Sequence, residues 1–465
     1  MRLRILHTND IHGHLEHWDL LSAYINNAQA LAQGQNEAIL TLDIGDAMDS
    51  VHPLVEASYG EIIVDLFNEA HYDVVTLGNN EGLNFSKERL ADLYARAKFD
   101  VTVANLLDDT TDQVPSFAQQ IVYKKINDIK VAIIGLTAPY ATYDLNGYII
   151  KKPIESIQQQ LSKLNQRETD LIILLSHLGI ETDRYIANLF PEIQLILGAH
   201  THHVFVHGEW ENQTLLAACG KFGNYIGDIE LYYKEDTHHW QMDARAISIE
   251  QLSQMYQVST TSDTYYQKGI NELEKRLVSD LPMTLSALDL VGEQSFIQLA
   301  LEAITIEAEV DFAMLNSGLF LRDLEAGILS EKELHEALPH PMHLAKVTLK
   351  GKDLKELLSD MHSQREDLRY KLINGLGFRG KVFGELVYKG FSYDQLKKQW
   401  LAKGQAIEDN KQYTFVTVDH LLFLPFFPMM EPHGNPQLIF PDFIRHTVRK
   451  YLHSKYPIEG SQMSE

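Results

Sequence analysis

The regular alternation of short apolar segments with longer amphipathic ones is the feature that most constrains the fold in the first half of the 465-residue chain. The apolar segments have the length and the Val, Ile and Leu content of buried strands. The stretches between them, such as 62–70 and 85–98, carry apolar residues near helical spacing. This order predicts a layered α/β domain in which helices cover a largely buried sheet. The expected strands are residues 2–6, 38–42, 74–77, 101–103, 130–134, 170–175 and 195–197.

Polar side chains follow five of these seven segments, at the point where each strand is expected to end. In an α/β sheet, ligands collect outside the carboxyl ends of the strands. Five clusters at five strand ends therefore predict a single site. The clusters are His7, Asp10 and His12; Asp43 and Asp46; Asn79 to Glu81; Ser176 and His177; and His200 to His203.

The length of the chain exceeds that of one compact core, so we expect two domains of roughly 150–250 residues. We place the first domain at residues 1–252. Residues 253–282 form a charged, Gln- and Glu-rich stretch that ends at Pro282, and we interpret it as a helical connector. Residues 283–458 have their own helix and strand patterns and form the second domain. We expect the tail, 459–465, to be disordered.

The net charge and the cysteine content exclude some binding partners and some kinds of site. The formal charge of −24 repels nucleic-acid phosphates, so we expect no nucleic-acid partner, and bound cations must supply positive charge if the protein handles phosphate. Cys219 is the single cysteine, which excludes an internal disulfide and a cysteine-based zinc site. No apolar run is long enough to span a membrane, and the start of the sequence lacks the pattern of a signal peptide. We therefore expect a cytoplasmic protein without a membrane partner; the sequence predicts no oligomeric state.

The first two clusters have the donor types of a metal site. Asp10 and His12 are two residues apart, so in an extended backbone both side chains point the same way. A carboxylate and an imidazole suit Zn, Mn, Fe or Co, although a polar turn after a strand gives the same pattern. Asp46 follows a glycine that permits a sharp turn, and one carboxylate can bridge two cations roughly 3.5–4 Å apart. Asp43 competes for this role, and Asp49 has the place of a helix cap.

Three histidines extend the candidate site. His177 follows five apolar residues, and His200 and His202 follow another strand and a glycine. A lone histidine in such a place is usually a hydrogen-bonded structural residue, whereas the pair at i and i+2 indicates ligation more strongly. With Asn79, the clusters supply seven side chains, against roughly eight donor positions for a pair of metals that share one ligand.

In these clusters the chain resembles the calcineurin-like metallophosphoesterases, and more closely their 5'-nucleotidase branch. The resemblance is carried by "LHTNDIHG", "LDIGD", "TLGNNE", "LLSHLG", "LGAHTHH" and "AACGKFGNYIG". Beyond the connector, "NSGLFLRDLEAGILS" is similar to the start of that branch's C-terminal domain. The resemblance implies mixed sheets flanked by helices in the first domain and a smaller α+β nucleotidase-type second domain.

The resemblance also implies a dinuclear centre of divalent Mn, Zn, Fe or Co. Two such cations would hold phosphate oxygens and activate a water for in-line attack on phosphorus. The implied substrate is a small-molecule nucleotide or similar phosphoester: a 5'-monophosphate, a 2',3'-cyclic nucleotide or a UDP-sugar. One metal would be held by Asp10, His12, Asp46 and His202, and the other by Asp46, Asn79, His177 and His200.

Asn80 departs from the family pattern. The third motif is usually G-N-H-E or G-N-H-D, and its histidine acts on the phosphate or the leaving group. Asn80 occupies this catalytic position and can donate a neutral hydrogen bond, but it cannot release a proton near neutral pH. Losing such a donor costs on the order of 10²–10³ in rate unless His7, His14 or His203 compensates. The alternative function is a catalytically weakened, metal-retaining protein that binds or senses nucleotides.

The second domain also departs from the branch, in which two aromatic rings sandwich the base. Phe378 and Arg379 in "GLGFRGKVFG" stand where the first ring is expected, and Phe426 or Phe427 replaces the second. Asn316 opens the "NSG" motif and completes the predicted substrate-binding set. A core role for the phenylalanines and a solvated role for the arginine are the open alternatives. In that branch the second domain rotates to bring substrate to the metals, and the connector would permit such motion.

Overall fold

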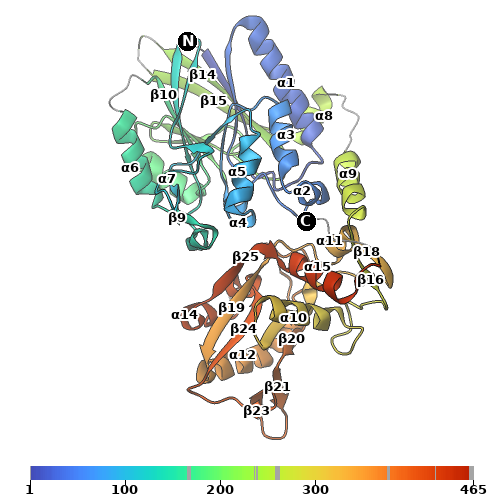
Figure 1. Cartoon of the computed structure of the whole chain (residues 1–465). Helices are drawn as coiled ribbons and strands as arrows, with labels where there is room; N and C mark the ends of the chain where they lie inside the picture. The colour runs from blue at the N-terminus through green and yellow to red at the C-terminus, as the bar shows by residue number, and fades with distance from the viewer. Residues whose placement is uncertain are drawn as a thin grey trace. The chain divides into compact units, whose positions relative to one another are not determined.

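The structure is a computed structural model that describes residues 2–164, 169–234, 236, 239–256, 262–373, 377–424 and 426–459. The chain divides into two compact units, Met1–Gly269 and Ile270–Glu465 (Figure 1). Residues 257–261 of the expected connector and residues 460–465 of the expected tail lie outside the described residues. Within the described part of the chain, no helix is long and apolar enough to cross a membrane.

The expected connector is helical only in part. Helices α8 (Ile249–Met255) and α9 (Ser262–Glu274) form, but Leu277–Leu281 is strand β16 and pairs antiparallel with β18 (Gly327–Ser330). The prediction of a helix as far as Pro282 is therefore wrong at its end. Val278 and Leu281 are 2% exposed and pack into the core of the second unit, which favours a paired strand over a solvated helix.

The first unit is built around two large sheets. In the seven-stranded sheet, β1 to β4 are parallel neighbours, and the hairpin of β14 and β15 adds antiparallel to β1. Its order is β15 (His239–Ser248), β14 (Tyr225–Lys234), β1 (Arg2–Thr8), β2 (Ala38–Asp43), β3 (Val74–Thr76), β4 (Asp100–Thr102) and β6 (Ala118–Gln119).

In the second, six-stranded sheet, β8, β10, β11 and β13 are parallel neighbours. Its order is β12 (Glu209–Glu211), β13 (Thr214–Ala217), β11 (Leu195–Gly198), β10 (Leu171–Ser176), β8 (Ile129–Leu136) and β7 (Val122–Ile126). A small antiparallel pair joins β5 (Leu106–Asp108) to β9 (Tyr148–Ile150). All seven strands expected from the sequence form, with ends shifted by one or two residues.

The two sheets pack face to face through apolar side chains such as Leu40 and Leu42 of β2 and Ile173 and Leu175 of β10. Helices α1 (Trp18–Gln35), α3 (Glu61–Glu69) and α5 (Lys87–Ala95) cover the outer face of the seven-stranded sheet. Helices α6 (Pro153–Leu164) and α7 (Ile180–Leu189) cover the other sheet (Figure 1). The predicted layered α/β class is confirmed, as a helix–sheet–sheet–helix sandwich.

The second unit is α+β, as the resemblance implied. Helices α10 (Phe296–Glu307), α12 (Gly351–Arg369) and α15 (Ile444–Lys455) contribute apolar faces to the core that the main sheet shares. That sheet has the order β20 (Leu386–Lys389), β17 (Phe312–Asn316), β24 (Gln412–Val418), β19 (His343–Lys350) and β25 (Gln437–Phe443). A smaller sheet contains β21 (Phe391–Asp394), β22 (Gln399–Ala402) and β23 (Gln405–Ala406).

Candidate metal centre

The predicted metal ligands follow five parallel strands at their carboxyl ends. Strands β1, β2 and β3 end at Thr8, Asp43 and Thr76, and β10 and β11 end at Ser176 and Gly198. The loops after these ends bring six of the seven side chains into two groups, and within each group the ligand atoms lie within 4.8 Å of one another. One group is Asp10, His12 and His202, and the other is Asp46, His177 and His200.

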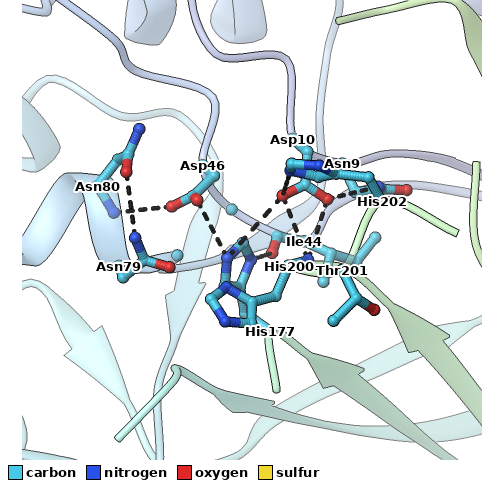
Figure 2. A network of polar contacts seen from close by, with 12 residues as sticks. Asn9, Asp10, Ile44, Asp46, Asn79, Asn80, His177, His200, Thr201 and His202 are labelled. Carbon is cyan, nitrogen blue, oxygen red and sulfur yellow. Dashed lines mark hydrogen bonds and ion pairs between the residues drawn. The ribbon is translucent and has the colours of Figure 1, made fainter. Parts of the chain in front are cut away.

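Asp46 lies within reach of histidines from both groups, and Figure 2 shows it beside His177. Its Oδ2 is 3.2 Å from Nε2 of His177 in its own group and 3.8 Å from Nε2 of His12 in the other. In the first group, Asp10 Oδ1 is 3.7 Å from His12 Nε2 and 3.5 Å from His202 Nε2. A carboxylate so placed can contribute to two neighbouring cations, which supports the bridging role predicted for Asp46.

Asp43, which competes with Asp46 for the bridging role, and Asp49, the expected helix cap, have partners outside the two groups. Both oxygens of Asp43 are engaged: Oδ2 accepts from Thr8 Oγ1 at 2.6 Å and Oδ1 accepts from the Gly45 backbone N–H at 2.9 Å. Asp49 accepts from the Val51 backbone N–H at 3.0 Å and closes a turn, whereas the cap of α2 (Pro53–Ala57) is His52. The prediction that Asp49 caps this helix is therefore wrong, because the helix begins three residues later than the aspartate requires.

Three buried atoms of the predicted ligands have no hydrogen-bond partner: His12 Nε2, Asn79 Oδ1 and His177 Nε2. Burying a polar atom in this way costs about 1–3 kcal/mol, so each one requires an explanation. His177 Nδ1 lies 2.7 Å from the Ile44 carbonyl, and donation to that oxygen leaves Nε2 with its lone pair free. Asn79 donates Nδ2 to Asn80 Oδ1 at 3.1 Å and keeps its own oxygen free. Imidazole nitrogens, carboxylates and an amide oxygen together fit borderline divalent cations.

Carboxylates and imidazoles in this cluster shift each other's pKa. Burial lowers the pKa of His177, but the facing carboxylates of Asp46 and Asp10 outweigh burial and raise it to about 10. Burial raises the pKa of Asp46, but the charges of His177 and His12 outweigh that effect, so the net direction is down. The site is therefore built to hold positive charge. Since a metal ligand must be a neutral imidazole, cation binding would displace the His177 proton.

Backbone strain is concentrated at the same residues. Five of the seven predicted ligands have a left-handed backbone, which side chains rarely adopt and which costs on the order of 1–3 kcal/mol per residue. Gly45, with a φ of 86°, precedes one of them, and a Cβ added to it would lie 2.1 Å from the Gly78 nitrogen. The two ligand loops approach so closely that only glycine fits. The five φ values are 50° for Asp10, 50° for His12, 54° for Asp46, 73° for His200 and 58° for His202.

Glu81 fixes two of the ligand loops. Its carboxylate is 2% exposed and accepts the backbone N–H groups of Asp46 and Gly78 at 3.0 and 2.9 Å on Oε2. Its Oε1 accepts those of Ala47 and Met48 at 2.8 and 3.1 Å. Four bonds to one buried carboxylate hold the Asp46 loop against the start of α4 (Asn79–Asn84). The spacing of Glu81 three residues after Gly78 was the available sequence signal.

Asn80 contacts three predicted ligands. Its Oδ1 accepts from Asn79, its Nδ2 lies 3.1 Å from His12 Nδ1, and its backbone N–H donates to Asp46 Oδ1 at 2.7 Å. Figure 2 shows the two asparagines together on one side of Asp46. These contacts hold the predicted ligands in position. Asn80 therefore has a structural role that does not depend on donating a proton to the leaving group.

Two of the histidines considered as replacements for the missing family histidine are held elsewhere. His7 is 1% exposed, and burial lowers its pKa to about 4. Its Nδ1 lies 3.7 Å from Cys219 Sγ, beneath the ligand loops. His203 Nδ1 lies 3.0 Å from Thr201 Oγ1. His7 has the surroundings of a packing residue, and His14 is considered below with the aromatic ring that it contacts.

Phe378 of the predicted substrate-binding set is packed inside the second unit. It is 4% exposed, and its ring stacks on two histidines. The ring centroids are 5.3 Å from His340 at 6° and 5.0 Å from His420 at 9°. A base would have to displace one of these histidines to stack on Phe378. This geometry favours the core alternative that the sequence left open.

The other predicted substrate-binding residues have mixed surroundings. Asn316 is buried and donates Nδ2 to the Phe383 carbonyl at 2.8 Å, which leaves its Oδ1 without a partner. The backbone N–H of Arg379 donates to a histidine ring nitrogen at 3.0 Å. Phe426 is half-buried with its ring 6.2 Å from that of Phe383, and Phe427 is 1% exposed in the core. Their role in binding stays a prediction.

Two aromatic residues beside the centre were not anticipated from the sequence. Tyr140 is 40% exposed, with its ring 6.1 Å from that of His200. It follows β8, a strand whose end had been assigned no functional residue, and that position was the available signal. Phe222 has its ring 5.9 Å from that of His12. It lies in a glycine-flanked motif that carried the family resemblance without an assigned role.

Both parts of the chain match families of known proteins. The family model of the calcineurin-like phosphoesterases matches residues 3–204, and that of the 5'-nucleotidase C-terminal domain matches residues 283–424. The chain is 34% identical over 457 residues to "Uncharacterized metallophosphoesterase YunD" of Bacillus subtilis (strain 168), covering 96% of this chain and 97% of that protein. It is 26% identical over 269 residues to the 5'-nucleotidase of Homo sapiens, covering 50% and 47%. The NAD nucleotidase of Haemophilus influenzae shares the fold, with a TM-score of 0.62 at 17% identity over 98% and 97% of the two chains.

Proposed function

The chain belongs to the calcineurin-like metallophosphoesterases with a 5'-nucleotidase C-terminal domain, and from this we propose that it hydrolyses a nucleotide or similar small phosphoester with two divalent cations. The family makes it a metal-dependent phosphoric ester hydrolase. The observation that carries the two-cation proposal is the set of buried atoms around Asp46 that make no hydrogen bond: His12 Nε2, Asn79 Oδ1 and His177 Nε2.

Two cations bound here would neutralise phosphoryl charge and activate a water for in-line attack on phosphorus. The protein contributes position: the Ile44 carbonyl orients His177, and Glu81 fixes the loop of Asp46. We assign one cation to Asp10, His12, Asp46 and His202, and the other to Asp46, Asn79, His177 and His200.

No protein nucleophile is required. Cys219 is buried, its Sγ lies 2.7 Å from Asn9 Oδ1, and burial raises the pKa of its thiol beyond the range in which a thiolate forms. Asn80 Nδ2 lies 3.1 Å from Nδ1 of the predicted ligand His12, and an amide cannot protonate a leaving group. We therefore propose that esters with good leaving groups, including cyclic and diphosphate esters, are favoured over alkyl monoesters.

A second candidate function rests on the same residue. With Asn80 in place of the family histidine, the protein would retain metals and bind or sense nucleotides with weak hydrolysis. The bond that Asn80 accepts from Asn79 and the bond that its backbone N–H donates to Asp46 favour the enzyme, because they give the asparagine a role in positioning the predicted ligand set. The substrate-binding role of the second unit is part of the proposal.

The test is a hydrolysis panel on the full chain loaded separately with Mn, Zn, Fe or Co. It covers nucleoside 5'-monophosphates, nucleotide sugars, 2',3'-cyclic nucleotides and an activated aryl phosphate. We expect about two equivalents of metal per chain by elemental analysis and turnover that depends on them. Hydrolysis that survives complete metal removal would contradict the proposal. Retained metal with nucleotide binding but no turnover on any ester would favour the binding protein.

A further inference from the structure

Phe222 shares the left-handed backbone of the predicted metal ligands but has no ligand atom. Its φ is 62°, between Gly220 at 77° and Gly223 at 63°. A bulky side chain with such a φ is an outlier, and outliers of this kind cluster at functional sites. The loop is tied to the ligand loops: Phe222 N–H donates to the Asp10 carbonyl at 2.8 Å, and Gly220 N–H donates to that of His203 at 2.9 Å.

The strained conformation places the Phe222 ring among three nitrogen-bearing side chains. The imidazole of His14 stacks on it with centroids 3.9 Å apart at 29°. The ammonium of Lys221 lies over the ring, 4.5 Å from its centroid. The predicted ligand His12 lies edge-on, with centroids 5.9 Å apart at 75°. The ammonium of Lys221 and the predicted ligand His12 therefore contact the same aromatic ring, which ties Lys221 to the candidate metal centre.

The charge of Lys221 has no carboxylate partner within the described residues, whereas His14 Nδ1 is 2.7 Å from Glu16 Oε1. This is unusual in a chain with a formal charge of −24, where carboxylates are abundant. A half-buried ammonium held on an aromatic ring keeps its three donors available to an anion. Such a charge beside a phosphoester site has a direct use, which is to bind negative charge on the substrate.

We propose that Lys221 binds a second anionic group of the substrate, a phosphate or a carboxylate carried by the leaving group, and that Phe222 positions Lys221 for this contact. This inference rests on the proposed function and narrows it to phosphoesters with negative charge beyond the scissile phosphate. Nucleoside diphosphate derivatives and carboxylated esters belong to this class. An aryl phosphate whose ring carries no charge does not.

The experiment compares Lys221→Gln with the wild type on two aryl phosphates that differ by one ring carboxylate. We expect kcat/KM to fall about tenfold or more on the carboxylated ester, mainly through KM, because one charge-assisted hydrogen bond is lost. The unsubstituted ester should change less than threefold. Lys221→Arg should restore most of the loss, and Phe222→Leu should reproduce part of it with the same preference for the carboxylated ester.

Lys125→Gln is the matched control, because it removes an exposed lysine of β7 and should change neither ester. Elemental analysis of each variant checks that the metals remain bound. An equal loss on both esters in Lys221→Gln would overturn the inference and leave the proposed function intact. Absence of metal-dependent turnover of any ester by the wild type would instead defeat the proposed function, and the inference with it.

Discussion

Both units contain buried histidines, and their surroundings shift the pKa of the imidazole in opposite directions. In the first unit, the carboxylates facing His177 outweigh burial and raise its pKa to about 10. In the second unit, burial lowers the pKa of His340 to about 3 and that of His420 to about 4. Burial alone makes an imidazole neutral and part of a core, whereas convergent carboxylates make the same side chain part of a cation site. Position relative to carboxylates, and not burial, separates the two roles.

The largest expected effect comes from removing the shared carboxylate. Asp46→Asn keeps the shape but removes the charge that faces both histidine groups, and we expect hydrolysis to fall by at least about 10³-fold with loss of bound metal. Elemental analysis and kcat/KM measure the two effects. Asp43→Asn is the matched control, since both oxygens of Asp43 already accept hydrogen bonds, from Thr8 and from the Gly45 N–H. Equal metal loss in the two variants would contradict the assignment of Asp46, and not Asp43, as the shared ligand.

Glu81→Gln should have the next largest effect. An amide in place of the carboxylate turns an NH₂ group toward backbone N–H donors, so two of the four bonds that fix the Asp46 loop are lost. We expect metal affinity and activity to fall about 10–100-fold, as for other residues that orient metal ligands. Calorimetric titration with the metal measures the metal affinity. Glu88→Gln, on the exposed face of α5, should leave it unchanged. Full metal affinity in Glu81→Gln would show that the loop holds its shape without these bonds.

Substitutions of Asn80 test whether this side chain acts by positioning the predicted ligands or whether the lack of a proton donor limits the rate. Asn80→Ala removes its contacts with Asn79 and His12, and we expect about a tenfold fall in kcat. Asn80→His should not raise the rate, because an imidazole cannot make both contacts with the geometry of an amide. The measurement is kcat on esters with good and poor leaving groups. A large gain for poor leaving groups in Asn80→His would mean that proton donation, and not ligand position, limits the rate.

The sequence predicted the convergence of the candidate metal ligands because parallel strands fix where their loops meet. Side chains just past the ends of β1, β2, β3, β10 and β11 therefore share one site regardless of loop details. The place of Glu81 three residues after Gly78 indicates its bond to the Gly78 N–H, but its three bonds to the Asp46 loop were not predictable, since they depend on how closely the Gly45 and Gly78 backbones approach. The second unit was less predictable for a similar reason. Phe378 has the sequence context of a ligand-stacking ring, and only tertiary packing shows His340 and His420 against it.

Phe378→Leu tests whether that ring is core or ligand platform. As a core residue it should mainly affect stability, with the second unit losing about 1–3 kcal/mol through poorer packing. Metal content should be unchanged, and KM should change less than threefold. Chemical denaturation and steady-state kinetics measure these quantities, and Phe426→Leu at the half-buried ring is the comparison. A KM increase of tenfold or more in Phe378→Leu without a stability loss would place substrate at this ring.

The smallest expected effect is the pH dependence of the second unit. The pKa of His420 is lowered from 6.5 to about 4 when folded, so the unfolded chain binds its proton first as pH falls. The contribution of His420 to unfolding free energy is complete above pH 6.5 and is lost as pH falls through 4, with a slope of at most about 1.4 kcal/mol per pH unit.

Burial raises the pKa of Asp419, the adjacent residue, to about 7, which acts in the opposite sense because its folded form keeps a proton that the unfolded form loses. The difference between the wild type and His420→Gln isolates the histidine, since Asp419 is present in both. Hydrogen exchange of β24 amides between pH 4.5 and 7 gives the local unfolding free energy. This free energy should change little with pH in the wild type, where the two groups oppose each other, and should rise as pH falls in the variant, where Asp419 acts alone. Parallel curves would mean that His420 takes up its proton in the folded state, and the neutral, core character assigned to the histidines of the second unit would then fail.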